Sequence, residues 1–428
     1  MNGVMNFKPI YEPRPDDGLR VMLYSHDSVG LGHLRRNLAI AGSITQSFSE
    51  ASAMIVTGSP CATQFELPAS TDLIKIPSIS KDSDGQHVTG SFGGSLETTL
   101  RFRSRMILET YRALSPDLII VVHQPTGLKG EDMATLKESK ANCSKIFFGM
   151  RDVVDSPDVV RRDWDNADCH WALNECYDQI CVYGKEEIFD SRVAYDPLLG
   201  NVKRCEFIGF IVPSHKVKSK KAGERTKKRV LVTFGGGNDG AQRAEHYLKA
   251  LTMQRVSWDS HIVTGPMMSL DMVRRLKEMA RVVQPPGSVS VKRFHRNLPS
   301  LMPQFDAIVS MAGYNSCAEI LQSGVPAIVL PRSFPRQEQL IRAVRLAQCG
   351  WAITMPQERP DPQCLIEVID TAINTARKPR PEADLDGLRN LSALVGQHLG
   401  IKLEETNGPS TSNTMKTSWD ASERRSVL

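Results

Sequence analysis

Residues 229–251 read RVLVTFGGGNDGAQRAEHYLKAL. The run from Arg229 to Phe234 is mainly apolar and rich in β-branched residues, three glycines follow it, and the segment from Ala241 to Leu251 has helical spacing. A strand, a glycine turn and a helix in this order are typical of the start of a βαβ unit. Because the strand's apolar residues are continuous rather than alternating, we predict that it is buried on both faces, as in a parallel sheet.

The same plan occurs earlier in the chain. Arg20–Ser25 (RVMLYS) is a strand-like run that stops at a glycine-containing turn, and Leu34–Ile44 then has helical spacing. Helix-length segments such as Leu96–Leu114 separate further strand candidates in both halves. These candidates are Ala53–Val56, Leu73–Ile76, Asp117–Val122, Lys145–Gly149, Gln179–Tyr183, His261–Thr264, Ser288–Val291, Asp306–Ser310, Ala327–Leu330 and Trp351–Thr354. The pattern predicts two doubly wound α/β domains that face a cleft.

A basic segment separates the two halves. From His215 to Arg229 the chain carries eight Lys or Arg and one Glu, which exceeds the net charge of +5 of the whole chain. The excess basicity therefore belongs to a linker rather than to a binding face, and no nucleic-acid partner is predicted. The predicted organisation is an N-terminal extension (1–19), a first domain (20–213), the basic linker (214–228), a second domain (229–380), a closing helix (381–403) and a disordered tail (404–428).

The composition limits the class of protein. At 428 residues, with 41% hydrophobic and 24% charged residues, the chain is typical of globular proteins. Its longest apolar run is about six residues, against the roughly 20 that a membrane-spanning helix needs. Nine cysteines without a CxxC pair predict free thiols rather than a zinc site. Charged residues stand where a signal peptide would have its apolar core, so we expect a cytoplasmic protein.

The loop after the first strand reads SHDSVGLGHLRR from Ser25 to Arg36. Gly30 and Gly32 match the first half of GxGxxG, but Arg35 replaces the third glycine, which disfavours a dinucleotide site. The turn delivers His33 to a helix start at the carboxyl edge of the sheet, where open α/β sheets bind ligands. An imidazole there can accept a proton near neutral pH. A histidine that only caps or packs is the alternative.

The loop after Phe234 is the stronger candidate for binding an anion. Gly235, Gly236 and Gly237 let the backbone approach a phosphate closely, and the helix that follows Asn238 offers free N–H groups. Two or three hydrogen bonds to a charged acceptor, each worth about 1.5–3 kcal/mol, would hold a diphosphate without a lysine. No glycine loop is followed by the GKS or GKT of a Walker motif. A purely structural glycine turn is the alternative.

A third group of residues follows the strand candidate that ends at Ser310. Ala312 and Gly313 predict a tight turn, and Asn315 or Ser316 is expected to cap the next helix. Glu319 lies one turn into that helix, where a carboxylate can accept two hydrogen bonds from a ribose diol. A surface glutamate on an amphipathic helix is the alternative.

These three loops, followed by LPRSFPRQEQ from Leu330 to Gln339, resemble glycosyltransferases of the two-Rossmann (GT-B) type. The resemblance is to the family that includes the N-acetylglucosaminyltransferase of lipid II synthesis and the plant galactolipid synthases, family 28. It covers roughly residues 20–400 and implies two Rossmann-like domains. It also implies inverting, metal-independent transfer of a sugar from a nucleoside diphosphate donor, with UDP expected, to an acceptor hydroxyl, with no cofactor.

The resemblance also implies roles for individual residues. His33 would act as the base on the acceptor side, with Asp27 in reserve and Gly30 and Gly32 beside it. The donor-binding residues would be Gly235, Gly236, Gly237, Asn238, Gly313, Tyr314, Asn315 and Ser316 around the diphosphate, Glu319 at the ribose, Glu338 and Gln339 at the sugar, and Phe294 at the base. The chain departs from the family pattern at GGGNDGA and at Arg342, where Asn is usual, so the donor sugar stays open.

Several alternatives stay open at this stage. An epimerase or hydrolase, or a non-catalytic nucleotide-sugar binder, would use the same fold and donor site. Asp82-Ser83-Asp84 and Asp163-Trp164-Asp165 match DxD, the metal motif of the other glycosyltransferase fold, although chance is the favoured explanation. Four arginines form a cluster that is either a solvated helix face or a peripheral contact with the inner face of a membrane. They are Arg101, Arg103, Arg105 and Arg112. The acceptor, a glycan, lipid or small molecule, is not specified.

Overall fold

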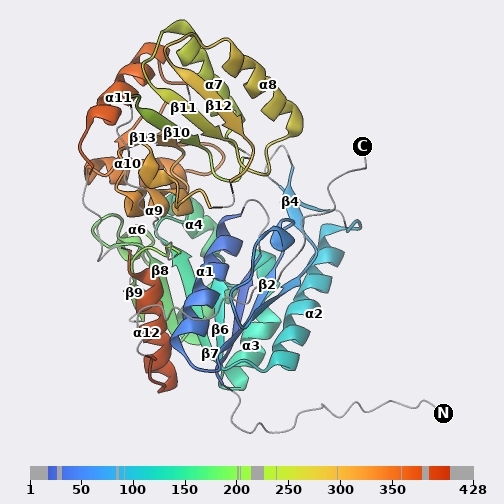
Figure 1. Cartoon of the computed structure of the whole chain (residues 1–428). Coiled ribbons are helices and arrows are strands. Elements are labelled where there is room, and N and C mark those ends of the chain that lie inside the picture. The colour runs from blue at the N-terminus through green and yellow to red at the C-terminus, as the bar shows by residue number, and fades with distance from the viewer. Residues whose placement is uncertain are drawn as a thin grey trace, which may run out of the picture.

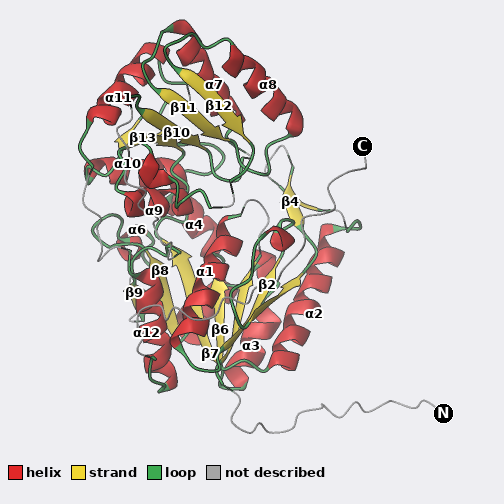
Figure 2. Ribbon diagram, in the orientation of Figure 1, coloured by secondary structure: helices red, strands yellow, loops and turns green. Residues whose placement is uncertain are grey.

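The computed structural model describes residues 18–26, 31–82, 86–90, 92–199, 202, 204–213, 226–237, 239–295, 297–357, 359–377 and 385–404. Nearly all of the predicted N-terminal extension, most of the basic linker and the predicted tail beyond residue 404 lie outside these ranges. The described residues form two α/β domains, each built around a parallel sheet with helices packed on it (Figures 1 and 2). The predicted fold class is confirmed.

The sheet of the N-terminal domain has seven parallel strands in the order β3-β2-β1-β6-β7-β8-β9. The strands are β1 (Arg20–Ser25), β2 (Ser52–Thr57), β3 (Thr71–Lys75), β6 (Leu118–Val122), β7 (Lys145–Arg151), β8 (Gln179–Tyr183) and β9 (Cys205–Phe207). The helices of this domain are α1 (Gly32–Ser47), α2 (Leu96–Leu114), α3 (Met133–Ala141), α4 (Pro157–Trp164), α5 (Ala167–Trp171) and α6 (Ser191–Ala194). A small antiparallel pair, β4 (Ile79–Lys81) and β5 (His87–Thr89), was not predicted from the sequence.

The sheet of the C-terminal domain has six parallel strands in the order β12-β11-β10-β13-β14-β15. The strands are β10 (Arg229–Thr233), β11 (Asp259–Val263), β12 (Ser288–Lys292), β13 (Ala307–Ser310), β14 (Ala327–Val329) and β15 (Ile353–Thr354). The helices are α7 (Ala241–Met253), α8 (Leu270–Arg281), α9 (Tyr314–Ser323), α10 (Glu338–Gln348) and α11 (Pro362–Asn374). β15 starts later than predicted because Trp351 and Ala352 form a bend after Gly350, whose φ is +69°.

The strand order explains where a ligand can bind. In each sheet the chain leaves the first central strand toward one edge and returns to pair on its other side, so β1 lies beside β6 and β10 lies beside β13. These positions are topological switch points, where loops at the carboxyl ends of the strands diverge and leave a crevice. Residues 118–122 of β6 are all at most 1% exposed, as the continuous apolar pattern predicted.

Helix α12 (Gly387–Leu399), the last one in the described part of the chain, lies beside the N-terminal domain (Figure 1). Its Ser392 hydroxyl is 3.1 Å from the Ser43 hydroxyl of α1. Gly387, at the start of α12, permits this packing because a Cβ there would lie 2.6 Å from the carbonyl oxygen of Gly209. The end of the chain therefore ties the two domains together.

The arginine cluster of α2 is corrected in part by the structure. Arg103 is fully buried, and its Nε lies 2.6 Å from Oε2 of Glu131, which also accepts a 2.5 Å hydrogen bond from the Tyr24 hydroxyl at Oε1. Arg112 pairs with Glu138, and Arg101 is exposed. Arg103 cannot belong to a basic surface because its charge is neutralised inside the domain. No helix among the described residues is long and apolar enough to cross a membrane.

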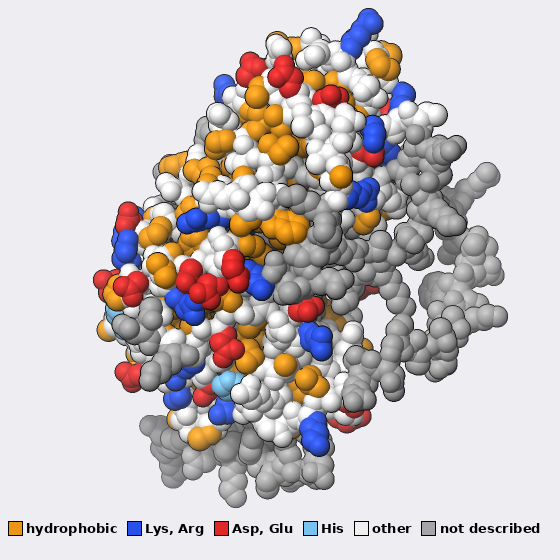
Figure 3. All heavy atoms as spheres, turned by 90° about the vertical axis from the view of Figure 1, so that its left-hand side faces the viewer, with side chains coloured by type: hydrophobic (Ala, Val, Ile, Leu, Met, Phe, Trp, Pro, Cys, Tyr) orange, Lys and Arg blue, Asp and Glu red, His pale blue; other side chains and the backbone are white. Residues whose placement is uncertain are grey.

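Charges on the molecular surface are mixed in sign. On the face seen in Figure 3, the described Lys and Arg side chains are interspersed with Asp and Glu side chains. The described part of that face therefore shows no continuous basic surface of the kind that tracks a phosphate backbone.

Candidate active site

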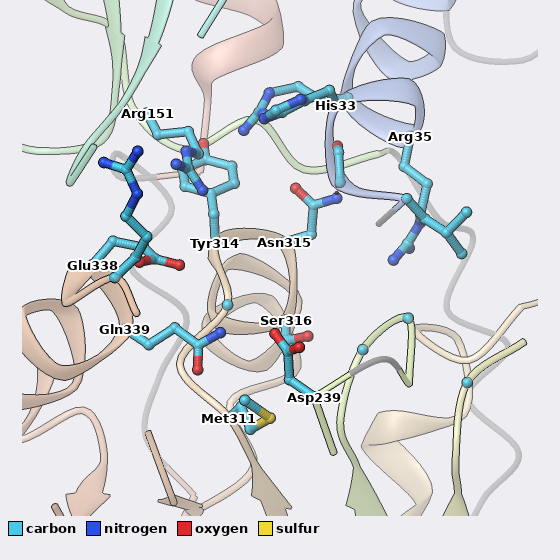
Figure 4. A pocket seen from close by; sticks show the side chains of 18 of the residues that line it. His33, Arg35, Arg151, Asp239, Met311, Tyr314, Asn315, Ser316, Glu338 and Gln339 are labelled. Carbon is cyan, nitrogen blue, oxygen red and sulfur yellow. Dashed lines mark hydrogen bonds between the residues drawn. The ribbon is translucent and has the colours of Figure 1, made fainter. Parts of the chain in front are cut away.

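A cavity of about 720 Å³ lies between the two domains. The loops after β1, β6 and β7 line it from the N-terminal domain, and the loops after β10 and β13, with the start of α10, line it from the C-terminal domain (Figure 4). This is the position that the two switch points predicted. Among the predicted site residues, Asp27, Gly30 and Asn238 lie outside the described residues.

The glycine loop of the C-terminal domain requires glycine for its geometry. Gly235 and Gly237 have φ angles of +66° and +97°. A Cβ on Gly237 would lie 2.5 Å from the carbonyl oxygen of Thr264, so any other residue would displace the neighbouring loop. The loop is held there by a 2.9 Å hydrogen bond from the backbone N–H of Met267 to the carbonyl of Gly236. The backbone is therefore exposed to the cavity, without side chains of its own.

Helix α9 begins at the same cavity with Gly313 as its N-cap, and no side chain caps it. The prediction that Asn315 or Ser316 caps this helix is wrong. Nδ2 of Asn315 instead donates a 3.1 Å hydrogen bond to the carbonyl of Gly32 in the other domain. The positive N-terminal end of α9, with the N–H groups of its first turn, therefore lies at the cavity. Such an end suits an oxyanion.

The two residues predicted to contact the donor sugar lie together at the start of α10. Glu338 and Gln339 are both buried and line the cavity. Oε1 of Glu338 accepts a 2.7 Å hydrogen bond from Nη2 of Arg332, and Oε1 of Gln339 accepts one of 3.2 Å from the Arg332 backbone N–H. Oε2 of Glu338 has no partner among the described residues. This oxygen remains available to a hydroxyl.

Glu319, predicted to bind the ribose, is not the surface glutamate of the alternative interpretation. It is only 5% exposed, lines the cavity and forms an ion pair with Arg35 of α1. Burial raises the pKa of Glu319, and the Arg35 guanidinium acts in the opposite direction. A ribose diol would have to share or replace this arginine.

Two aromatic residues of the predicted donor site have different surroundings. Tyr314 is buried, its ring lies 4.8 Å below the Arg36 guanidinium, and its hydroxyl accepts a 2.9 Å hydrogen bond from the Ile211 backbone N–H. Phe294, just after β12, is 44% exposed and lines the far side of the cavity. Tyr314 thus joins the two domains, whereas the ring of Phe294, near whose backbone the base was predicted, is exposed at the cavity.

Three histidines meet at the N-terminal-domain side of the cavity. The ring centroids of His33 and His123 are 4.6 Å apart, and those of His26 and His123 are 5.3 Å apart. Burial lowers the pKa of both His33 and His123 well below 6.5, and neighbouring charged groups, among them Arg36 and Arg151, lower it further. Both imidazoles are therefore neutral at pH 7, the form that accepts a proton.

His123 was not predicted from the sequence as a site residue. It directly follows the buried strand β6 and has a φ of +84°, which is uncommon for a residue with a side chain. Its backbone N–H donates a 3.0 Å hydrogen bond to the carbonyl of Gly149, which fixes this conformation. The rule that selected His33, a histidine at the carboxyl end of a central strand, would also have selected His123.

The two neutral histidines give stability a pH dependence. In the folded chain His33 and His123 have pKa values below 6.5, so the unfolded chain binds protons first as the pH falls. Their contribution to stability is therefore present above pH 6.5 and is lost as the pH falls through the folded pKa. Asp132 acts in the opposite direction, because burial raises its pKa to about 7.

We expect wild type to lose more stability than His123→Gln between pH 7.5 and 5.5, measured by urea denaturation. Parallel curves for the two proteins would contradict this.

Ion pairs between the domains account for two features of the sequence. Arg336 lies 2.9 Å from Asp155 and 3.0 Å from Asp163, so Asp163 of the second DxD match is neutralised by an arginine rather than placed to hold a metal. In the first match, Ser83 and Asp84 lie outside the described residues. No group of three His, Cys, Asp or Glu among the described residues is arranged to hold a metal ion.

Arg342, the departure from the family pattern, is also explained by the domain interface. Its guanidinium is fully buried, and Nη2 lies 2.7 Å from Oδ1 of Asp152, in the other domain. It also donates hydrogen bonds to the carbonyls of Ala312 and Val153, at 2.8 and 3.1 Å. The arginine thus joins the domains and does not replace a donor-binding asparagine.

Comparison with known proteins relates this geometry to an enzyme family. Residues 216–392 match the glycosyltransferase family 28 C-terminal domain. Over most of its length the chain superimposes on solved structures, namely Acinetobacter baumannii MurG (TM-score 0.58, 14% identity, 89% of this chain and 99% of that one) and the calicheamicin glycosyltransferase CalG4 (TM-score 0.59, 12% identity, 89% and 98%). The fold is that of the GT-B glycosyltransferases. The glycine loop, α9 and the start of α10 all lie in the part that matches family 28.

Curated relatives of the family 28 domain share only part of their length with this chain. They include two enzymes named UDP-N-acetylglucosamine–N-acetylmuramyl-(pentapeptide) pyrophosphoryl-undecaprenol N-acetylglucosamine transferase. The one from Leuconostoc citreum is 29% identical over 153 residues, 35% of this chain and 41% of the relative. The one from Bacillus thuringiensis is 24% identical over 209 residues, 48% and 52%. The chain therefore spans about half or less of these two relatives, and the predicted resemblance to family 28 is confirmed for the C-terminal domain.

Proposed function

We propose that this protein is a glycosyltransferase that moves a sugar from a nucleoside diphosphate donor to an acceptor hydroxyl. The observation that carries the proposal is the pairing of two sides of one cavity. A side-chain-free glycine loop and the uncapped start of α9 lie on one side, and two neutral histidines, His33 and His123, lie on the other. The first suits a diphosphate, and the second suits a hydroxyl that must lose its proton.

The C-terminal domain would bind the donor. The diphosphate lies against the loop from Gly235 to Gly237 and the first turn of α9, and the sugar hydroxyls lie against Glu338 and Gln339. Phe294 covers the base. Glu319 accepts hydrogen bonds from the ribose hydroxyls once its ion pair with Arg35 has opened. UDP is the expected nucleotide, since the relatives of the family 28 domain are named for a UDP-sugar.

The N-terminal domain would present the acceptor to His33. The imidazole accepts the hydroxyl proton while the acceptor oxygen bonds to the anomeric carbon, and the bond from that carbon to the diphosphate oxygen breaks. The electron pair leaves with the nucleoside diphosphate, whose charge the amides of the glycine loop and of α9 stabilise without a metal. Attack from the side opposite the leaving group inverts the anomeric centre.

The donor site can be tested with a single methyl group. Gly313 lines the cavity with open space where a Cβ would stand, so Gly313→Ala should fold normally and block the approach of a phosphate. We expect one of UDP-, GDP-, dTDP- and ADP-sugars to stabilise wild type by about 2.7 kcal/mol at a hundredfold excess over Kd. The same donor should bind Gly313→Ala at least about tenfold more weakly, which corresponds to one lost charged hydrogen bond, as measured by calorimetry.

The matched control is Gly32→Ala. It adds the same methyl group in open space on the opposite side of the cavity, and its donor affinity should equal that of wild type. If no nucleotide sugar stabilises the protein, the transferase proposal fails. Release of free sugar without an acceptor would instead assign a hydrolase.

A further inference from the structure

Arg151 is a cation whose charge the described protein does not neutralise. It is the last residue of β7, at the carboxyl edge of the sheet, and it lines the cavity. Figure 4 shows it near His33 at the top of the view, with the Tyr314 side chain reaching toward it from α9 and with Glu338 and Gln339 below. The carboxyl end of β7 thus places a guanidinium in the region between the proposed base and the proposed sugar site.

Five other arginines line the cavity. One of them, Arg36, lies over the rings of Tyr183 and Tyr314, and each of the other four has a carboxylate partner. These pairs are Arg35 with Glu319, Arg332 with Glu338, Arg336 with Asp155 and Arg342 with Asp152. Arg151 forms no ion pair with a described residue. Its one side-chain hydrogen bond there runs from Nη2 to the carbonyl of Val154, at 3.4 Å. Its Nε is buried without a partner in the described part of the chain.

The nearest acidic groups are already in use. Glu338 and Asp152 both favour the charged form of Arg151, but neither forms an ion pair with it: Oε1 of Glu338 is bonded to Arg332, and both carboxylate oxygens of Asp152 are bonded to Arg342. Burial outweighs them, helped by the positive charges of Arg342 and Arg36, and lowers the pKa of Arg151 to about 10. The guanidinium therefore stays protonated at neutral pH while its charge lacks a direct counterion. A partly buried cation without a direct counterion is costly, so an anionic ligand gains more here than at the open surface.

We propose that Arg151 binds an oxyanion, a carboxylate or a phosphate, carried by one of the two reacting sugars. The inference rests on the proposed function and adds to it the charge of a substrate. A guanidinium with free N–H groups donates two parallel hydrogen bonds to such a group. Because Arg151 lies between the histidines and Glu338, the anion belongs either to a uronic acid on the donor or to the acceptor close to its reacting hydroxyl.

Calorimetry with pairs of charged and neutral probes tests this proposal. For the donor source, UDP-glucuronate is compared with UDP-glucose. For the acceptor source, glucuronate and glucose 6-phosphate are compared with glucose, with and without UDP. We expect one charged probe to bind about tenfold to a hundredfold more tightly than its neutral match, since charged hydrogen bonds are worth that factor. Arg151→Gln should abolish the preference, and Arg151→Lys should keep part of it. Arg112→Gln, which removes an exposed charge, is the control.

Each outcome of this experiment decides one point. A preference in the donor pair or in the acceptor pair identifies the source of the anion. Equal affinities within every pair, or a preference that survives Arg151→Gln, overturn the proposal. Failure of UDP to bind, with an Arg151-dependent preference still present, rejects the proposed function and keeps the anion site.

The ligand-free melting temperature is a second readout. Arg151→Gln should not lower it, whereas a structural arginine would.

Discussion

His33→Ala is expected to lower turnover by about 10²-fold to 10⁴-fold, the usual contribution of a general base. Donor affinity should stay within about twofold of wild type, because the residues proposed to hold the donor lie in the other domain. The loss arises because the substitution removes the imidazole that is proposed to accept the hydroxyl proton as the new bond forms. Steady-state kinetics with the donor found by the binding screen, together with calorimetry, separates the two quantities.

A second readout separates a base from a histidine that only packs. Imidazole added to His33→Ala should restore part of the turnover, because the small base can enter the cavity left by the side chain. His170→Ala is the control, since His170 is a partly exposed histidine that is bonded to Asp165 and is not among the residues that line the cavity. Turnover of His33→Ala within about threefold of wild type would remove His33 from the mechanism and make Asp27 the next candidate.

Local sequence patterns predicted the sheets because the burial of a strand depends on the polarity of its own side chains. The run from Leu118 to Val122 has no polar side chain, and a strand without one must be buried on both faces. The loop from Gly235 to Gly237 was predicted because successive glycines let the backbone approach a phosphate closely, and the structure adds that Gly237 has a φ of +97°, which glycine adopts readily. Positions at the ends of such strands follow from topology, which explains why His33 was found.

Contacts between distant residues could not be predicted in this way. The partner of Arg103 is 28 residues away, and that of Arg342 is 190 residues away, in the other domain. A sequence shows an arginine on a helix but not the carboxylate that meets it. Arg151 is the converse case, because its significance lies in the partner that it lacks among the described residues. Charge pairing across the cavity became visible only with the structure.

Arg342→Met is expected to lower the free energy of unfolding by about 3–5 kcal/mol, as breaking one side of a buried ion pair does. The substitution leaves the carboxylate of Asp152 almost fully buried without its counterion, and it leaves the carbonyl of Ala312 without its donor. Urea denaturation measures the loss. Arg112→Met is the control, because its exposed pair with Glu138 should contribute less than about 1 kcal/mol.

A double-mutant cycle tests whether the ion pair is the cause. Once Arg342 is gone, Asp152→Asn removes a charge that has become unfavourable, so the double variant should be more stable than the two single losses add up to. Additive losses would show that the arginine acts through its carbonyl contacts instead. Because Ala312 immediately precedes the N-cap of α9, weakening this contact should also loosen the proposed phosphate site. Arg342→Met should therefore bind the donor more weakly, although the proposed base His33 is unchanged. Such a result would show that the domain interface supports donor binding.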